Sequence, residues 1–406
     1  MKKSIYIMAL GAFGIITTEF GIIGIMPAIA KHFEISIDTA GWLLSGFALT
    51  IALTGPFSVL LTSKINRKWM MSLVLFIFVL SNILSAVAPS FTLLMIARIL
   101  PAFLHPVFWA VATVAAAKQV EPKDAPKAVS VVLAGLSVAT VLGVPLTTYV
   151  SELINWKASF WVSGAINLIA FAALSAFVPS MPVTEKQSVK SQLVILRKGQ
   201  MWVNLVATMI MIAGIFATYS YLAEYLGKIS SMNGKQISIM LLLFGTTGIA
   251  GNWITGLALS KNVMLTTRFF LLSLIAVHVM AYLFGGLFVP MTAIVGIWGF
   301  IHTGGFLIGQ TRSTSEAPEA PELAASLMVS FGNAGVTLGT FLGGIIIASF
   351  GVHQVIWISI LLLLVSLALT FVVIGKPSVA VEGKAFEQGG YEQEVSIPED
   401  ECVLEV

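Results

Sequence analysis

The sequence predicts an all-α membrane protein in which twelve transmembrane helices form two pseudo-symmetric six-helix bundles. Of its 406 residues, 57% are hydrophobic and only 10% are charged, whereas a soluble domain carries roughly 25% charged residues. The apolar residues come in blocks of about 20, the length needed to cross a hydrocarbon core of about 30 Å. The two halves also repeat each other, because "TVLGVPL" and "VTLGTFL" align Gly143 with Gly339.

Six apolar blocks lie on each side of a central polar stretch. They cover residues 5–30, 39–61, 69–89, 91–117, 128–151 and 157–179, then 201–227, 236–259, 264–288, 290–311, 324–350 and 352–375. The chain therefore divides into a first bundle (1–179), a cytoplasmic linker loop (180–200), a second bundle (201–375) and a tail (376–406). The tail holds eight acidic residues against two lysines, without apolar periodicity, so we expect an acidic, disordered cytoplasmic tail.

Lysine and arginine are divided unevenly between the two ends of the predicted bundle. With both termini placed in the cytoplasm, the inner segments hold 17 of the 22 basic residues and the outer loops hold four, Lys31, Lys157, Lys228 and Lys235. The remaining one, Arg98, lies inside the fourth span. By the positive-inside rule, both termini and the 180–200 loop are cytoplasmic.

Several classes of protein are disfavoured by what the sequence lacks. The single cysteine, Cys402, excludes an intramolecular disulfide, and a net charge of +3 gives no reason to expect a nucleic-acid partner. We find no Walker A run, no glycine-rich phosphate cradle and no His/Cys metal cluster. We therefore expect no enzyme and no cofactor, with the proton gradient as the energy source. The first span lacks an A-x-A cleavage site, so we expect it to be retained.

Five short stretches stand out along the chain. They are "TTEF" (17–20), "RILPAFLHPVFW" (98–109), "GVPL" (143–146), "NWKASF" (155–160) and "SFGNAG" (330–335). Together they resemble the major facilitator superfamily, and within it the twelve-span drug:H⁺ antiporter family with its sugar and arabinose efflux subgroup. The resemblance covers about residues 4–376. It implies a monomeric, multi-pass protein of the bacterial inner membrane, whose partners are a small-molecule substrate, protons and the lipid bilayer.

Two stretches depart from the pattern of that family. The loop after the second span, "VLLTSKINRK" (59–68), keeps the motif residues Arg67 and Lys68 but has Ser63 in place of the usual aspartate. The charge lock of the family therefore lacks its acid. In the fifth span, Gly143 and Pro145 match the antiporter motif, but Thr147 replaces the glycine that often follows, and we expect looser helix packing there.

Glu19 lies in the middle of the first apolar span. An ionised carboxylate costs several kcal/mol in such surroundings, so burial favours its neutral form. Such a group can take a proton from one side of the membrane and release it on the other, which makes Glu19 a candidate for proton coupling and for substrate binding. The alternative is a neutral glutamic acid bonded to a backbone carbonyl or a neighbouring helix. Thr17 and Thr18 are expected to bond to their own preceding turn.

Three residues of the fourth span are further candidates. Arg98 can supply a fixed positive charge to a carboxylate for proton coupling, or it can bind helix-end carbonyls in a structural role. His105 precedes Pro106, where we expect the helix to be broken, and it can relay protons, bind substrate or simply pack in the core. Trp109, one turn further, is positioned to stack on a sugar or an aromatic ring.

The second half offers a weaker set of substrate-binding candidates. Ser220, Tyr221 and Glu224 have spacings that place them on one helix face, although Glu224 is also four residues from Lys228 and can pair with it. His302 and Asn333 are polar residues in the tenth and eleventh spans. They can line a cavity, or they can hold helices together.

The favoured interpretation is a proton-coupled exporter that works by alternating access and carries a small neutral or polar molecule such as a sugar, a nucleoside or an amphenicol. Two alternatives stay open. The motifs do not fix direction, so the same fold can import a nutrient as a proton symporter or facilitator. A membrane sensor or scaffold that transports nothing is the second alternative, which the short soluble loops disfavour.

Overall fold

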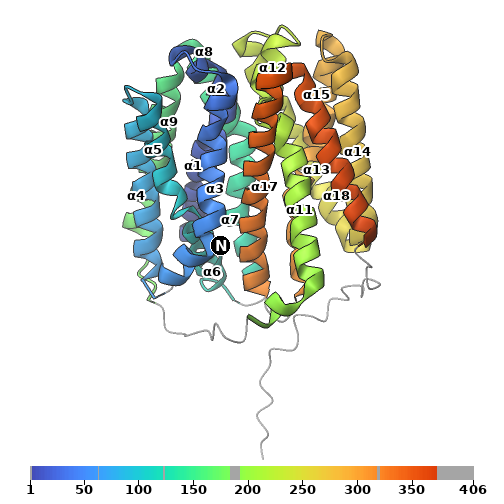
Figure 1. Ribbon diagram of the computed structural model, residues 1–406. Coiled ribbons are helices and arrows are strands. Elements are labelled where there is room, and N and C mark those ends of the chain that lie inside the picture. The colour runs from blue at the N-terminus through green and yellow to red at the C-terminus, as the bar shows by residue number, and fades with distance from the viewer. Residues whose placement is uncertain (1, 63, 122–123, 183–192, 318–320, 373–406) are drawn as a thin grey trace, which may run out of the picture.

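A computed structural model describes residues 2–62, 64–121, 124–182, 193–317 and 321–372, which fold into a bundle of long helices (Figure 1). The first half contains α1 (Lys3–Phe20), α2 (Ile22–His32), α3 (Ile37–Thr62), α4 (Arg67–Ala86), α5 (Phe91–Ala102), α6 (His105–Ala117), α7 (Ala125–Val138), the π-helical turn η2 (Ala139–Gly143), α8 (Val144–Leu153) and α9 (Trp156–Phe177). The second half contains η3 (Leu193–Arg197), α11 (Gly199–Tyr219), α12 (Leu222–Lys228), α13 (Gly234–Lys261), α14 (Val263–Phe284), α15 (Phe288–His302), α16 (Gly304–Glu316), α17 (Pro321–Phe350), η4 (Val352–Gln354) and α18 (Val355–Val372).

The predicted all-helical architecture with twelve spans is confirmed. Twelve stretches of the described chain, from Lys3–His32 to Val352–Phe371, are long and apolar enough to cross a membrane. The helix ends differ from the predicted ones by only a few residues. The predicted disordered tail and residues 183–192 of the predicted linker loop fall outside the described residues, so those two predictions stay predictions.

The first, fourth, seventh and tenth spans are each made of two helices joined at a short interruption. The interruptions are Gly21, Phe103–Leu104, Ser220–Tyr221 and Thr303. In the fourth span, Pro106 lies in the first turn of α6, where its missing N–H costs nothing, and it cannot continue a helix from the preceding residues. The predicted break at His105–Pro106 is therefore confirmed. Broken spans free backbone carbonyls at mid-membrane depth, where side chains must satisfy them.

The two halves share the same glycine-mediated helix contact. A Cβ atom at Gly143 would lie 2.2 Å from Thr17 Oγ1 of the first span. A Cβ atom at Gly339 would lie 2.2 Å from the carbonyl oxygen of Ala213 in the seventh span. The aligned glycines therefore bring the fifth span onto the first and the eleventh onto the seventh, as expected of two repeated bundles.

The expectation of looser packing around Thr147 is met only in part: Thr147 lines a small cavity together with Gly21, but its own side chain is closely held. Its side chain is only 2% exposed, and its hydroxyl group lies 2.8 Å from the carbonyl oxygen of Val144 and 3.3 Å from that of Gly21. Thr147 fits against the first span because the residue facing it, Gly21, has no side chain. A Cβ atom at Gly21 would lie 2.9 Å from Thr147 Oγ1. The first and fifth spans therefore still approach closely here, with the glycine on the first span instead of the fifth.

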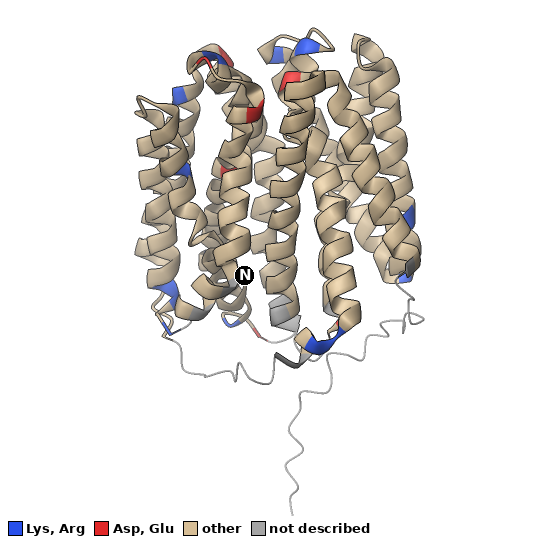
Figure 2. Ribbon diagram, in the orientation of Figure 1, with Lys and Arg blue, Asp and Glu red and all other residues tan. Residues whose placement is uncertain are grey.

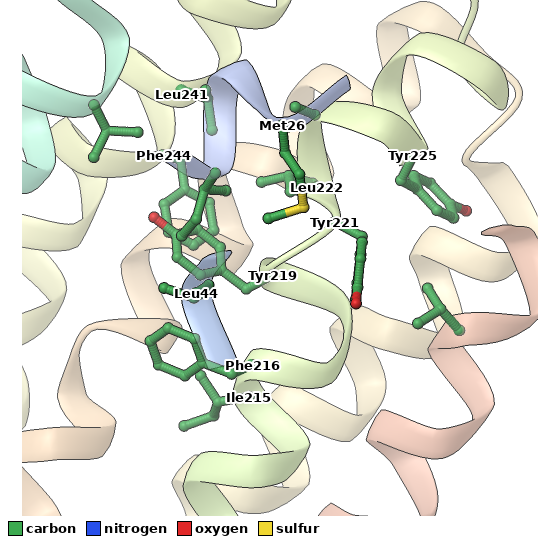
Figure 3. Packing of buried hydrophobic residues seen from close by; sticks show 14 of the residues in the cluster. Met26, Leu44, Ile215, Phe216, Tyr219, Tyr221, Leu222, Tyr225, Leu241 and Phe244 are labelled. Atoms are coloured by element: carbon green, nitrogen blue, oxygen red, sulfur yellow. The ribbon is translucent and has the colours of Figure 1, made fainter. Parts of the chain in front are cut away.

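One large hydrophobic cluster joins the two halves at the end of the bundle that carries α2 and α12. Figure 3 shows part of it, with Met26 and Leu44 of the first half packed near Phe216, Leu222 and Phe244 of the second. The buried members of the two other clusters lie toward the opposite end, and each of these clusters belongs to one half. Burial of apolar surface therefore ties the halves together mainly at one end.

Helix contacts between the halves also close this end, and one pair continues toward the other end. α3 and α17 pack along most of their length, and α2 meets α12. α13 packs on α8 and η2 rather than on α7, with Gly245 so close that its Cβ would lie 2.6 Å from Val141 Cα. Figure 1 shows α3 and α17, and above them α2 and α12, in the middle of the bundle. The halves are thus closed at the end that the charge pattern predicts to be extracellular.

At the other end, the loop after the second span is held by an amide. Asn66 Nδ2 donates to Ser180 Oγ at 2.7 Å, and Asn66 Oδ1 accepts from the backbone N–H of Lys68 at 3.0 Å. The N–H of Arg67, the other retained motif residue, donates to the carbonyl of Met181 at 3.1 Å. Asn66 and Arg67 therefore dock this loop onto the segment after the sixth span.

We predict that Gly251→Ala destabilises the second bundle by about 1–3 kcal/mol, the usual cost of overpacking. A Cβ atom at Gly251 would lie 1.6 Å from the backbone carbonyl oxygen of Phe300, which cannot move aside without shifting α15. Thermal unfolding of the purified protein measures the effect. The control is Gly256→Ala in the same helix, where the nearest heavy atom is 3.7 Å away. Equal unfolding temperatures for the two variants would contradict the packing described.

Candidate functional site

Glu19 is the penultimate residue of α1, next to the interruption at Gly21. It is 4% exposed, and its Oε2 atom lies 3.0 Å from Nε2 of His105, the first residue of α6. The two broken spans of the first half therefore each contribute one ionisable side chain to this contact. A buried carboxylate requires such a partner, because an isolated charge there costs several kcal/mol.

Trp109 competes with Glu19 for the same ring nitrogen. Its indole N–H donates to His105 Nε2 at 3.1 Å. That nitrogen has one in-plane site, which holds either a lone pair or a hydrogen atom. When Nε2 carries hydrogen it can donate to the carboxylate of Glu19, and the indole N–H has no acceptor. When Nε2 is bare it can accept from Trp109, and only a protonated Glu19 can bond to it.

The histidine is otherwise enclosed by aromatic rings. The ring centroids of Phe47 and Phe78 lie 5.9 and 6.4 Å from that of His105. Nδ1 of His105 has no hydrogen-bond partner among the described residues. In this apolar enclosure the bond between Glu19 and His105 is strengthened by the low local dielectric, and its rearrangement carries a large energy.

Arg98 holds the end of the broken first span. Its Nη1 and Nη2 atoms donate to the backbone carbonyls of Thr18 and Glu19 at 3.1 and 3.2 Å, and Nε donates to the carbonyl of Leu43 at 3.3 Å. Because α1 ends at Phe20, the last carbonyl groups of the helix lack intrahelical hydrogen-bond donors. The two Nη atoms of the guanidinium group donate to these carbonyls instead. The structure thus brings Arg98 to the backbone of Glu19, with His105 at its carboxylate.

A polar cluster that the sequence analysis missed fixes the same turn. The Thr18 hydroxyl donates to the carbonyl of Gly14 and accepts from the amides of Asn82 and Asn167, all at 3.0 Å. The expected back-bond of Thr18 is confirmed, whereas Thr17 Oγ1 has no partner among the described residues. The signal that could have found the two asparagines is their isolation in the otherwise apolar third and sixth spans.

In the second half, Ser220 and Tyr221 are brought together while Glu224 is not. Ser220 Oγ lies 2.8 Å from Thr340 Oγ1, and the Tyr221 hydroxyl donates to the Thr340 carbonyl at 2.9 Å. Glu224 instead forms an ion pair of 2.7 Å with Lys228. The break at Ser220–Tyr221 interrupts the helical spacing on which the expected common face depended.

His302 ends α15 inside an aromatic cluster. Its ring lies 4.4 Å from that of Tyr219 and 5.0 Å from that of Phe244, measured between centroids. Figure 3 shows Tyr219 stacked against Phe244, with Tyr221 pointing to the other side. Phe216 contacts His302 and also reaches across to Phe20 of the first half, at 5.8 Å. Tyr219 was not among the predicted site residues, because its aromatic neighbours come from other spans.

Asn333 is buried in α17, where its amide nitrogen donates to the carbonyl of Val329 at 2.9 Å, one turn earlier in the same helix. One turn later, the Thr337 hydroxyl bonds to the Ser45 carbonyl across the two halves at 3.2 Å. Asn333 therefore lies on a helix that contacts both bundles, and the bond that it makes is local.

Charged side chains are almost confined to the ends of the bundle. Figure 2 shows acidic residues at the end with α2 and α12, basic residues at both ends, and very few of either in the middle. Glu19 and Arg98 are the exceptions that the site uses. The arrangement can hold one proton at a defined place within a neutral interior.

Comparison with known proteins identifies the family. A model of the Major Facilitator Superfamily matches residues 8–322. The chain belongs to this superfamily. Its members are transporters and not enzymes, which agrees with the prediction from the sequence.

Relatives and solved structures give the same family. The inner membrane transport protein YdhP of Escherichia coli K12 is 32% identical over 343 residues, which are 84% of this chain and 88% of that protein. A "probable sugar efflux transporter" of Helicobacter pylori P12 is 28% identical over 352 residues, 86% of this chain and 90% of that protein. A bacterial homologue of the human lysosomal transporter Spinster, solved in an inward-facing, unoccupied conformation, superposes with a TM-score of 0.75 at 17% identity, covering 92% of this chain and 97% of that one. The protein is thus a multi-pass membrane transporter with this fold.

We predict that Arg98→Lys destabilises the protein by about 1.5–3 kcal/mol, the scale of hydrogen bonds made by a charged group. A lysine keeps the charge but cannot reach three carbonyls on two helices with one ammonium group. Thermal unfolding measures the effect, with Arg67→Lys at the start of α4 as the control. If Arg98→Lys unfolds at the wild-type temperature, the role of the arginine is its charge alone and the capping role is wrong.

Proposed function

We propose that the protein is a proton-coupled exporter of a small neutral or polar molecule, of the drug:H⁺ antiporter type. The observation that carries the proposal is the buried Glu19–His105 pair, built where the first and fourth spans are broken. The name of the Helicobacter relative, a "probable sugar efflux transporter", favours export and a sugar-like substrate.

The proton is held by Glu19 and His105 and sensed by Trp109. When Glu19 is ionised, a hydrogen on His105 Nε2 bonds to the carboxylate and excludes the indole N–H. When Glu19 is protonated, a bare Nε2 can accept from the indole N–H of Trp109, one turn further along α6, or from the carboxyl group of Glu19. Gain of a proton by Glu19 therefore changes which hydrogen bonds His105 can form. Because Trp109 lies further along the fourth span, this change links the charge of Glu19 to the inner part of that span.

The proposed transport cycle depends on which side of the membrane can exchange a proton with Glu19 and His105. The halves are closed at the end predicted to be extracellular, and the proposed cycle takes this arrangement as the one that serves the cytoplasm. In the proposed cycle, loss of the proton to the cytoplasm permits substrate loading. After the halves rock about their interface, protonation from the outside favours release of the substrate. Proton entry then drives the return.

The side chains around the breaks favour an uncharged substrate. Tyr219, His302 and Phe216 offer ring faces and hydrogen-bonding groups, whereas the carboxylate of Glu19 is occupied by His105 and that of Glu224 by Lys228. A polycationic drug would need more free acidic groups than these. Sugars, nucleosides and amphenicols combine hydroxyl groups with an apolar face, and such molecules suit stacking on aromatic rings.

We predict that Glu19→Gln abolishes uphill transport and its pH dependence, because glutamine keeps the volume and hydrogen bonding but cannot exchange a proton. Downhill flux of substrate is expected to persist. The assay is proteoliposomes with an imposed pH gradient, loaded with a substrate chosen from a thermal-shift panel of sugars, nucleosides and amphenicols. Glu152→Gln, an exposed residue of α8, is the control. Uphill efflux by Glu19→Gln with the wild-type pH profile would rule out this role of the carboxylate.

We predict that Trp109→Phe keeps transport but changes the midpoint of its pH profile, because the indole N–H is a hydrogen-bond partner of His105 Nε2. Without the indole N–H, a bare Nε2 loses its second partner. The measurement is the initial rate of substrate flux in proteoliposomes as a function of pH. An unchanged midpoint, with a lower rate only, would show that Trp109 acts by packing alone.

The same vesicles separate export from the alternatives. Substrate added to vesicles with an acid-loaded lumen makes the lumen alkaline if the protein exchanges substrate for protons. Proton and substrate that move together indicate symport. Absence of saturable binding and of flux for every substrate class would favour a sensor or scaffold and contradict the proposal.

A further inference from the structure

A groove lies on the seam between α3 and α17, at the end of the bundle predicted to be extracellular. Its volume is about 40 Å³, and it is lined by Asp38, Gly41, Trp42 and Ser45 of α3, by Tyr221, and by Thr340, Phe341, Gly344 and Ile345 of α17. This space is separate from the Glu19–His105 pair, and the proposed transport mechanism does not use it.

Two aromatic rings form the walls of the groove and a tyrosine forms its floor. Trp42 and Phe341 are 41% and 43% exposed on the outside of the bundle, with ring centroids 5.6 Å apart. Tyr221 below them is 2% exposed. Glycines make the space for its hydroxyl, since Cβ atoms at Gly41 and Gly344 would lie 2.2 and 2.8 Å from Tyr221 Oη. The groove is therefore open to the lipid side and closed toward the interior.

Asp38 supplies a negative charge that the protein does not balance. It is the second residue of α3, and it forms no ion pair with any residue that the structure describes. The nearby hydroxyl of Tyr221 is already committed to the carbonyl of Thr340. Glu224, at the same end of the bundle, has Lys228 as its partner. A free carboxylate beside two aromatic faces is complementary to a cation, which it attracts by its charge while the rings attract it by their quadrupoles.

We propose that this groove binds the primary ammonium headgroup of a phospholipid of the phosphatidylethanolamine class. The groove opens on the membrane-facing surface, and Leu49 on α3, about two turns further along the same helix face than Trp42, continues that surface toward the bilayer centre with 37% exposure, where acyl chains would lie. Asp38 begins its helix and so lies at headgroup depth. The volume admits an ammonium group, which is close to water in size.

Binding there would act on the two halves together. Asp38 and Trp42 belong to the first bundle, whereas Tyr221 and Phe341 belong to the second. A headgroup held between them bridges the halves at their closed end and stabilises that arrangement by mass action. The inference does not depend on proton coupling or on the identity of the transported molecule.

The test is lipid retention by the intact protein, measured by native mass spectrometry after reconstitution in equal amounts of phosphatidylethanolamine and phosphatidylglycerol. We expect the wild type to retain the ethanolamine lipid several-fold over the glycerol lipid, and Asp38→Asn to lose that preference. Glu152→Gln, which removes an exposed carboxylate elsewhere at the same end, is expected to keep it. We also expect the ethanolamine lipid to raise the unfolding temperature of the wild type and not that of Asp38→Asn.

A second variant guards against a folding defect in the first. Trp42→Leu keeps an apolar wall and Asp38 but removes the ring face, and it is expected to weaken the preference without abolishing it. Equal retention of both lipids by the wild type would overturn the proposal, as would an undiminished preference in Asp38→Asn. If a single-chain alkylammonium detergent competes with the lipid only when Asp38 is present, that result supports the ammonium site.

Discussion

The structure depends on satisfying one carboxylate buried in an apolar bundle. Glu19 is placed where α1 ends, and an ended helix leaves carbonyl groups without partners. Arg98 donates to those carbonyls, and His105 meets the carboxylate. The positive charge therefore stabilises the broken backbone, while an imidazole, whose ring nitrogen can donate or accept a hydrogen bond, holds the acid. Because Arg98 bonds to the backbone and not to the carboxylate, the proposed proton exchange at Glu19 leaves the helix end in place.

The broken spans give the two halves different side chains, which is why the proposed function places the proton in the first half. In the first half, the interruptions at Gly21 and Phe103–Leu104 bring Glu19 and His105 together. In the second half, the interruptions at Ser220–Tyr221 and Thr303 bring aromatic rings around His302, and the neighbouring acid, Glu224, is paired with Lys228. The two halves thus have similar pairs of broken spans but different side chains at the breaks, which suit a proton in the first half and an uncharged ligand in the second. Phe20 of the first half and Phe216 of the second contact each other between these two sets of side chains.

Composition and charge pattern were enough to predict the fold, because hydrocarbon thickness fixes span length and apolar blocks show it directly. The broken fourth span was predictable from Pro106, and Glu19 stood out as a charge in an apolar run. The pairing of Glu19 with His105 was not predictable, since it joins helices 86 positions apart in the sequence through a tertiary contact. The supporting roles of Asn82 and Asn167, and the exchange of partners between Gly21 and Thr147, likewise depend on which helix faces meet.

The central claim is that Glu19 gains and loses a proton inside the membrane. Infrared difference spectra of the reconstituted protein between acid and alkaline pH test it without a substrate. The account predicts a carbonyl stretch from a protonated carboxyl group that disappears on alkalinisation, is missing in Glu19→Gln and shifts when His105 is replaced by glutamine. A spectrum of Glu19→Gln identical to that of the wild type would contradict it.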